Sequence, residues 1–262
     1  MANLFHTLSG DESGVRSTLT DAVWIEAHPE PQCRSVMLDR YKRSLDTVTE
    51  QELEKIRSKT VGVVGAGGLG GYVIEMLARF GVGTLRIIDG DRFDETNLNR
   101  QLLAVEANLG KAKAEEAALR VAAINSTVQT EILAGKFGSE NADQFLSGLD
   151  VVLDCLDNVG TRLLLEQRCK VLGIPLVHGA VGAWSGQVLT ILPGDDTLYN
   201  LYGADGTPIP PIGAASFVPA TIASYQVAEC IKLLIGRGDL LRRRMMCFDL
   251  WNNHHFVVDL DD

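Results

Sequence analysis

Residues 61–70 read VGVVGAGGLG, an apolar run of strand length that passes directly into a glycine-rich loop and then into a helical pattern. Gly65 permits a tight reversal, Gly67 and Gly68 let backbone N–H groups approach a phosphate, and Gly70 allows a helix to pack closely on the turn. The start of the following helix adds a dipole that favours an anion. The segment therefore predicts a nucleotide-binding turn, without choosing between NAD, FAD and ATP.

Strand and helix patterns alternate along the chain after this turn. We expect strands at 84–88, 128–133, 151–154, 176–181 and 186–192, and a terminal hairpin at 245–249 and 256–260. We expect helices at 72–80, 111–124, 161–172 and 217–235. This alternation predicts an α/β fold: a Rossmann-like, mostly parallel sheet with helices on both faces and an antiparallel C-terminal extension.

The sequence predicts one domain that follows an arm. Residues 1–37 are polar and weakly patterned, and Pro29 and Pro31 disfavour a helix there, so we expect an extended N-terminal arm. Residues 38–262 are expected to form a single domain. Its parts are one or two short helices at 38–59, a nucleotide-binding half at 60–182, and a second half at 183–262 with a crossing loop at 196–216.

Composition limits the function classes. Hydrophobic residues make up 46% of the chain and charged residues 22%, which is enough apolar material for a core. The net charge is −10, which argues against a nucleic-acid partner. The 5 cysteines form no Cys-x-x-Cys pair and indicate a reducing compartment. We find neither a secretory signal pattern nor an uninterrupted apolar run of membrane-spanning length, and we expect a cytoplasmic protein without a membrane partner.

Polar side chains follow the second predicted strand. Asp89 ends this strand about 20 residues after the glycine loop, where a carboxylate accepts hydrogen bonds from a ribose in NAD and ATP alike. Asn97, Arg100 and Gln101 have the i, i+3, i+4 spacing of one face of a short helix. That spacing predicts a fixed cation beside the nucleotide.

Two further charged residues begin or follow later elements. Lys113 lies at the start of a predicted helix, and Asp157 lies just past a strand end, where ligands of open α/β sheets bind. Phosphate-anhydride chemistry needs cations for the phosphates and a carboxylate for Mg²⁺, whereas a nicotinamide site has little use for them. The set therefore favours ATP with Mg²⁺.

At these residues the chain resembles the ThiF/MoeB/HesA family, the prokaryotic relatives of ubiquitin-activating enzymes. The motifs that carry the resemblance are RYKR at 40–43, GAGGLG at 65–70, DGD at 89–91, NLNRQ at 97–101, GKAK at 110–113, DCLDN at 154–158, HGA at 178–180 and GQV at 186–188. The resemblance implies an adenylyltransferase: the C-terminal carboxylate of a small ubiquitin-like sulfur-carrier protein ending in Gly-Gly attacks the α-phosphate of ATP. The products are an acyl-adenylate and pyrophosphate, and the resemblance implies a use in sulfur transfer for cofactor biosynthesis.

The resemblance also implies roles for single residues. It implies that Asp89 holds the ribose, that Asn97, Arg100 and Lys113 bind the phosphates, and that Asp157 binds the Mg²⁺. It also implies that Arg43 acts as an arginine finger in the site of the neighbouring subunit. Asp91 and Gln101 are expected at the nucleotide with the glycine loop. A finger that reaches the neighbouring subunit implies a homodimer.

The chain departs from the family pattern in its cysteines. Many members hold a structural zinc with two Cys-x-x-Cys pairs, which this sequence lacks, and residues 207–216 contain no cysteine for a covalent link to the carrier. We therefore expect no zinc and no covalent enzyme intermediate. Cys155 and His178 are interpreted as structural, and Trp184 and Trp251 are expected to pack against the sheet rather than to line a groove for the carrier's tail.

Other functions fit part of the sequence. The glycine loop with Asp89 also satisfies the fingerprint of an NAD-dependent oxidoreductase, which leaves Arg100, Lys113 and Asp157 unexplained. An inactive scaffold or carrier-binding member of the family is a second alternative, and retention of these charged residues counts against it. A third alternative keeps the adenylation but changes the acceptor to a peptide or an RNA base, and the acidic charge disfavours RNA. The carrier, its pathway and the sulfur donor stay open.

Overall fold

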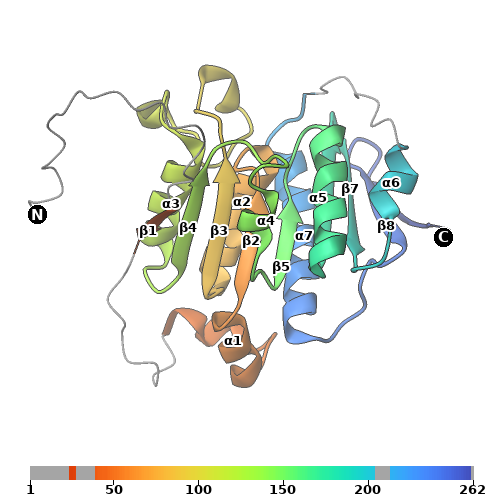
Figure 1. Ribbon diagram of the computed structural model, residues 1–262, viewed down its shortest axis with the longest axis horizontal. Coiled ribbons are helices and arrows are strands. Elements are labelled where there is room, and N and C mark those ends of the chain that lie inside the picture. The colour runs from red at the N-terminus through yellow and green to blue at the C-terminus, as the bar shows by residue number, and fades with distance from the viewer. Residues whose placement is uncertain (1–23, 28–38, 204–212, 261–262) are drawn as a thin grey trace, which may run out of the picture.

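The computed structural model describes residues 24–27, 39–203 and 213–260. The strands in this part of the chain form one nine-stranded sheet in the order β1-β4-β3-β2-β5-β6-β7-β8-β9 (Figure 1). The strands are β1 (Trp24–Ala27), β2 (Thr60–Val64), β3 (Thr84–Asp89), β4 (Gln129–Ala134), β5 (Val151–Asp154), β6 (Leu176–Gly182), β7 (Ser185–Ile191), β8 (Arg244–Asp249) and β9 (His254–Asp259).

The centre of the sheet is parallel and its edges are antiparallel. Strands β4, β3, β2, β5 and β6 run in one direction, β7 to β9 continue as antiparallel neighbours, and β1 adds antiparallel to β4. The predicted fold is thus confirmed. Val64 is in register with both Ile88 and Asp154, so the carboxyl ends of β2, β3 and β5 lie side by side. The chain order reverses at β2, which makes the crevice between these ends the expected ligand position.

Helices cover both faces of the sheet (Figure 1). One layer holds α2 (Gly68–Phe80), α3 (Lys113–Ile124) and α7 (Phe217–Ile235), and the other holds α4 (Ala142–Leu146), α5 (Val159–Leu172) and α6 (Thr197–Tyr202). Strand β2 shows why both layers are needed, because Val63 packs into the first layer and Val64 into the second. A strand buried on both faces reads as a continuous apolar run rather than as an alternation.

The short helices before β2 also match the prediction. They are the 3₁₀ helix η1 (Asp39–Ser44) and α1 (Glu50–Arg57), which begins with a capping box between Thr49 and Glu52. Two more 3₁₀ turns, η2 (Glu95–Asn97) and η3 (Glu106–Asn108), lie between β3 and α3. Figure 1 shows α1 beyond the amino ends of the central strands, opposite the carboxyl ends.

Three details differ from the sequence prediction. Helix α4 was not expected, and β1 lies within the predicted arm, whose other residues are outside the described part of the chain. The crossing loop predicted at 196–216 begins with a helix, α6, because the Glu166 carboxylate accepts the N–H groups of Leu198 (2.6 Å) and Tyr199 (2.9 Å). Residues 204–212 of that loop lie outside the described residues.

Helix α7 is long and apolar enough to cross a membrane by length and composition. It contacts α2, β6 and β7, and half of its apolar window is buried inside the protein. Its buried Glu229 accepts hydrogen bonds from the Thr190 hydroxyl (2.6 Å) and the Leu241 N–H (2.8 Å). These contacts give α7 the role of a core helix that joins the two halves of the domain.

Candidate functional site

A cavity of about 1090 Å³ opens at the carboxyl ends of β2, β3 and β5. Its lining brings together nine of the predicted site residues: Gly65, Gly67, Gly68, Asp89, Asp91, Arg100, Gln101, Lys113 and Asp157. Ligand pockets commonly measure roughly 300–1,000 Å³. The cavity therefore has room for a nucleotide and for the end of a second substrate.

The glycine turn has the geometry that the sequence predicts. Gly65 has a φ of +97°, in the left-handed region that favours glycine, and its N–H donates to the Ile88 carbonyl (2.9 Å). A Cβ on Gly70 would lie 1.8 Å from the Gly65 carbonyl oxygen, so only glycine lets α2 start this close to the turn. Gly67 and Gly68 instead face the cavity, with no atom within 3.8 Å of the position of an added Cβ.

Asp89 joins the turn to the end of β3. Its Oδ2 accepts the Ala66 N–H (2.7 Å) and its Oδ1 accepts the Asp91 N–H (2.8 Å). Burial raises the pKa of Asp89, although both of these hydrogen bonds and the Lys113 ammonium act against the rise. Each oxygen keeps acceptor capacity on the cavity side, which suits a pair of ribose hydroxyls.

Three cations form one wall of the cavity: Arg100, Lys113 and Lys136. Lys113 is 6% exposed and its Nζ lies 3.5 Å from Asp91 Oδ2, while Lys136 Nζ lies 3.6 Å from Asp91 Oδ1. The Arg100 guanidinium donates to the Thr96 carbonyl (2.7 Å). This arrangement leaves an excess of positive charge beside the glycine turn, and the sequence analysis had missed Lys136.

Asn97 does not line the cavity, although its helical spacing had predicted a contact with the nucleotide. Helix η2 ends at Asn97, so Arg100 and Gln101 follow in turns rather than on one continuous helix. The Asn97 amide belongs to a capping box, in which its Oδ1 accepts the Asp94 N–H (3.3 Å) and its Nδ2 donates to Asp94 Oδ1 (3.2 Å). Asn97 thus shapes the segment that carries Arg100 and is absent from the cavity lining.

Gln101 supplies an unpartnered polar atom at the glycine turn. Its side chain is 7% exposed and lies next to Gly67, and its Oε1 has no hydrogen-bond partner among the described residues. Buried polar atoms almost always have a partner. An unpartnered one in the cavity wall is consistent with a polar ligand at this position.

Asp157 is the carboxylate that fits a metal ion at this site. It is exposed, lies beyond β5 and lines the cavity. Mg²⁺ uses one or two protein carboxylates and takes its remaining ligands from phosphates and water. Among the four aspartates that line the cavity, Asp89 and Asp91 bind the turn and the lysines and Asp249 binds its own loop, so the exposed Asp157 fits an ion that arrives with a nucleotide.

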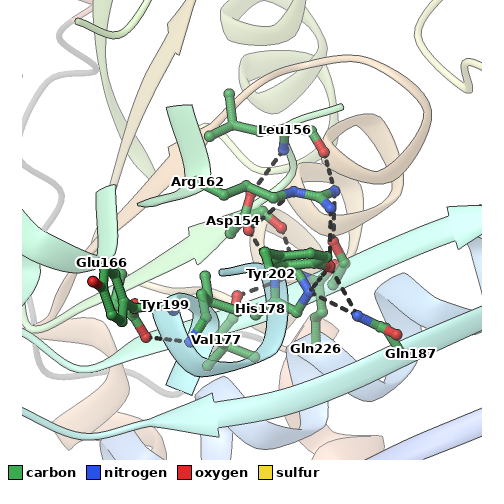
Figure 2. A network of polar contacts seen from close by, with 12 residues as sticks. Asp154, Leu156, Arg162, Glu166, Val177, His178, Gln187, Tyr199, Tyr202 and Gln226 are labelled. Carbon is green, nitrogen blue, oxygen red and sulfur yellow. Dashed lines mark hydrogen bonds and ion pairs between the residues drawn. The ribbon is translucent and has the colours of Figure 1, made fainter. Parts of the chain in front are cut away.

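A buried polar network forms the wall at the ends of β5 and β6 (Figure 2). The fully buried His178 donates from Nδ1 to Asp154 Oδ2, 2.6 Å away, and its Nε2 faces Tyr202 and Gln187, each at 3.3 Å. Burial lowers the pKa of His178 and keeps the ring neutral. Burial opposes ionisation of Asp154 as well, but the Arg162 guanidinium, 3.5 Å away, and His178 together hold its pKa below the ordinary value.

Arg162, Gln187 and Tyr202 line the cavity, although the sequence analysis had not selected them. They come from α5, β7 and α6, which are far apart in the sequence and meet only in the fold. The spacing Asp157 to Arg162 places the arginine one helical turn inside α5, and the GQV motif contains Gln187. Those positions were the only signals available before the structure.

A model described as the ThiF family matches residues 41–261. The chain belongs to the ThiF family. Among curated relatives of this ThiF-family chain, the SAMP-activating enzyme E1 of Haloferax volcanii is 36% identical over 222 residues, 82% of each chain. The adenylyltransferase and sulfurtransferase MOCS3 of Drosophila grimshawi is 37% identical over 211 residues, 74% of this chain and 45% of MOCS3.

Solved structures show the same architecture. Escherichia coli MccB with ATP superposes with a TM-score of 0.74 at 18% identity, covering 87% of this chain and 72% of that chain. The E. coli tRNA N6-threonylcarbamoyladenosine dehydratase TcdA, in complex with AMP, has a TM-score of 0.65 at 27% identity, covering 75% of this ThiF-family chain and 94% of TcdA. The likeness to MccB supports the fold alone.

Three of the four cysteines in the described part of the ThiF domain are core residues, whereas Cys247 is half-buried and lines the cavity. Cys155, Cys169 and Cys230 are at most 8% exposed and belong to the two main apolar clusters. Burial raises the pKa of the Cys155 thiol well above its ordinary range, so the nucleophilic thiolate is disfavoured. Burial of Cys155 and the buried, hydrogen-bonded position of His178 agree with the structural interpretation, and Cys155 also lines the cavity.

The expectation that two tryptophans pack on the sheet was wrong. Trp184 is 42% exposed and Trp251 is 67% exposed. The Trp184 ring lies 5.0 Å from Trp251 and 4.8 Å from Phe217, centroid to centroid, and the three rings form an aromatic cluster on the surface. The three aromatic residues are within two positions in the sequence of the cavity-lining Ser185, Pro219 and Asp249, but they do not themselves line the cavity of the ThiF site.

Arg43 is the predicted site residue that lies farthest from the others in the fold. It is exposed on η1, which precedes α1 near the amino ends of the central strands (Figure 1). The cavity lies at the carboxyl ends, and Arg43 is absent from its lining. A five-residue strand such as β2 spans roughly 17 Å, so Arg43 does not act on the cavity of its own chain.

Proposed function

We propose that this ThiF-family protein is an ATP-dependent adenylyltransferase that activates the C-terminal carboxylate of a small ubiquitin-like sulfur carrier ending in Gly-Gly. The observation that carries the proposal is the cavity itself, which combines a phosphate-binding turn, a cationic wall and the Asp157 carboxylate. The names of its relatives, the SAMP-activating enzyme E1 and MOCS3, support the same reaction and the same kind of acceptor. MOCS3 is about twice as long, so its sulfurtransferase activity is not carried over to this chain.

The geometry supports a division of roles around ATP. Asp89 would hold the ribose, and the N–H groups of the turn at Gly67 and Gly68 would bind phosphate oxygens. Arg100 and Lys113 would neutralise the charge that builds on the departing pyrophosphate. Asp157 would bind Mg²⁺, which would supply further positive charge for the phosphates.

In this reaction the carrier carboxylate is the nucleophile. A carboxylate oxygen forms a bond to the α-phosphorus, the bond from the α-phosphorus to the bridging oxygen breaks, and pyrophosphate leaves with the electron pair. No proton transfer is required, because the nucleophile is already ionised. The protein therefore contributes mainly alignment and positive charge.

The exposed aromatic cluster supports a position for the carrier. Trp184, Phe217 and Trp251 form an exposed apolar patch next in sequence to cavity-lining residues, and such patches mark protein interaction sites. A carrier docked there would direct its flexible C-terminal tail past Ser185 into the cavity. We place this reaction in the cytoplasm, in sulfur transfer for cofactor biosynthesis.

The position of Arg43 supports a homodimer. Because this exposed arginine lies at the opposite end of the sheet from the cavity, a role at the nucleotide requires the cavity of a second subunit. We propose that Arg43 of each subunit reaches the phosphates in the other. In a mixed dimer of Arg43→Ala and Arg100→Ala subunits, one cavity then keeps both arginines and about half the activity per dimer returns. Mixtures that stay inactive would exclude action across the interface.

Exchange of labelled pyrophosphate into ATP tests the proposed function. With purified protein, Mg²⁺ and a ubiquitin-like carrier ending in Gly-Gly, we expect exchange that depends on the carrier and disappears with Lys113→Met. A carrier shortened by its last two glycines is the matched control. Absence of exchange with every carrier tested, combined with NAD binding, would replace this proposal by the oxidoreductase alternative.

A further inference from the structure

Helix η1 carries three cations, two of which have partners within the domain. Lys42 Nζ lies 2.9 Å from Asp39 Oδ1, and the Arg40 guanidinium donates to Asn125 Oδ1 (2.5 Å). Arg43 is exposed and makes neither a hydrogen bond nor an ion pair with any residue in the described ranges. An exposed arginine without an internal partner is available to a second subunit.

The orientation of η1 must come from contacts with the rest of the domain. Hydrogen bonds in a 3₁₀ helix are poorly aligned, and runs longer than three or four residues are uncommon. Isolated helices shorter than about 12–15 residues are marginal in water. The six residues of η1 therefore depend on tertiary contacts, and the position of Arg43 depends on those same contacts.

Tyr41 is the side chain that fixes η1 to the domain. It is fully buried and packs with Val48 and Leu53 in a small apolar cluster. Its ring lies against Gly81 at the end of α2, where an added Cβ would lie 2.4 Å from the Tyr41 hydroxyl oxygen. A buried tyrosine usually has a hydrogen-bond partner for its hydroxyl group.

Asn125 supplies this partner and uses each hydrogen-bonding group of its side-chain amide. The residue is 1% exposed and caps the C-terminal end of α3. Its Nδ2 donates to the Tyr41 hydroxyl oxygen (2.7 Å) and to the Ala78 carbonyl (2.9 Å). Its Oδ1 accepts from Arg40 (2.5 Å) and from the Thr127 hydroxyl (2.8 Å). Thr127 Oγ1 in turn lies 3.4 Å from the Tyr41 hydroxyl and can accept its proton.

The neighbours of Asn125 determine the orientation of its amide. The Arg40 guanidinium can only donate and the Ala78 carbonyl can only accept, so the amide oxygen faces Arg40 and the amide nitrogen faces Ala78. One amide thereby connects the end of α2, the end of α3 and η1. Removal of one partner leaves a buried polar group unpaired, which costs more than the loss of an exposed hydrogen bond.

We propose that Asn125 and Tyr41 are positioning residues for Arg43. They hold η1 in the orientation from which Arg43 of one subunit reaches the phosphates in the cavity of the other. Neither of the two lines the cavity, so each acts through η1. Helix α3 begins at the cavity-lining Lys113 and is capped by Asn125, so its two ends serve the cavities of different subunits. The inference rests on the proposed function and deepens it, because it names the residues that make the arginine of the second subunit effective.

Mixed dimers with one active cavity test the proposal. One subunit carries Arg100→Ala, which inactivates its own cavity, and supplies Arg43 to the intact cavity of the other subunit. Asn125→Leu is placed either in this arginine-supplying subunit or in the subunit with the intact cavity. The two subunits are coexpressed with different affinity tags, and purification through both tags selects the mixed dimer. Both arrangements contain the same two substitutions, so a general loss of stability would lower exchange in both.

The two arrangements should differ in carrier-dependent pyrophosphate exchange at saturating ATP. With Asn125→Leu in the arginine-supplying subunit the rate should fall at least about tenfold, because misplacement of a reacting group by about 1 Å can cost on the order of 10²-fold. In the other arrangement it should change by less than about twofold. Tyr41→Phe keeps the buried ring and should show the same asymmetry, and it replaces Asn125→Leu if that variant does not fold. As a matched control, Lys59→Met removes an ion pair with Asp150 before β2 and should lower exchange in neither arrangement.

Equal losses in the two arrangements, or no loss with the change in the arginine-supplying subunit, would overturn the proposal. Two reference dimers separate this result from the proposed function. A dimer of wild-type and Arg100→Ala subunits without carrier-dependent exchange would refute the proposed adenylation. Exchange that survives Arg43→Ala in the arginine-supplying subunit would refute the action of Arg43 across the interface.

Discussion

Gly68 and Gly70 lie only two residues apart in the nucleotide turn, but replacing each by alanine should have a different effect. Gly70→Ala should lower the stability of the fold, and Gly68→Ala should lower the affinity for ATP. An added Cβ at Gly70 would lie 1.8 Å from the Gly65 carbonyl oxygen and 2.8 Å from its carbonyl carbon. An added Cβ at Gly68 would have its nearest neighbours at 3.9 Å, on the side of Arg100 and Pro219. The methyl group of Gly70→Ala collides with the backbone, whereas that of Gly68→Ala enters the space where a phosphate is proposed to bind.

The size of the Gly70→Ala effect follows from this contact. Cβ atoms essentially never approach a neighbour within 3.0 Å, so the start of α2 must move away from the turn by at least about 1.2 Å. Overpacking of a core typically costs about 1–3 kcal/mol, and the gain in helix propensity returns no more than about 1 kcal/mol. We expect the free energy of unfolding to fall by about 2 kcal/mol, which lowers Tm by roughly 4–8 °C in a protein of this size.

Gly68→Ala should leave Tm unchanged or slightly raised, because the methyl group meets open space and alanine favours the helix. Its ATP affinity should fall by at least about tenfold, because a phosphate loses close contact with the turn. Thermal unfolding without ligand and calorimetric titration with ATP measure the two effects separately. A Gly70→Ala protein with wild-type Tm, or a Gly68→Ala protein with wild-type ATP affinity, would refute the reasoning.

Three further predictions concern other parts of the site. Lys113→Met keeps the buried stem of the side chain but removes the charge, and pyrophosphate exchange should fall on the order of 10²-fold without loss of Tm. Burial lowers the pKa of His178, so the unfolded chain takes up a proton first as the pH falls, and stability present above about pH 6.5 is lost below it. His178→Asn should therefore lose less Tm than the wild type between pH 7 and pH 5, and equal losses would contradict this sign. Trp184→Ala should raise KM for the carrier by about tenfold and leave KM for ATP unchanged, measured in the exchange assay.

The sequence predicted the fold and one half of the cavity because these depend on local signals. A glycine turn after an apolar strand, Asp89 at a strand end and Lys113 at a helix start all reveal their positions through the elements beside them. Parallel strands then bring their ends together, and the structure confirms that these residues share one cavity.

The other half of the cavity could not be predicted, because it depends on contacts between segments that are far apart in the sequence. Arg162, Gln187 and Tyr202 meet because α5, β7 and α6 converge on the buried Asp154 and His178, and no periodicity in the sequence encodes that meeting. Asn97 shows the opposite error. Its helical spacing suggested a ligand contact, but Asp94 holds its amide in a local capping box, an interaction that competes with regular helix formation.

The charge distribution joins the two halves into one mechanism. ATP brings several negative charges, and the three cations beside the glycine turn outnumber the nearby carboxylates of Asp89 and Asp91 by one, whereas the Arg162 charge is matched by the buried Asp154. If Arg162 were unpaired, it would attract the phosphates to the wall where the acceptor must lie, and both substrates would compete for one position. Under the proposed function, the buried Asp154 would prevent this competition and keep the nucleotide apart from the carboxylate that attacks it, and Arg43 of a second subunit would add to the positive charge at the phosphates.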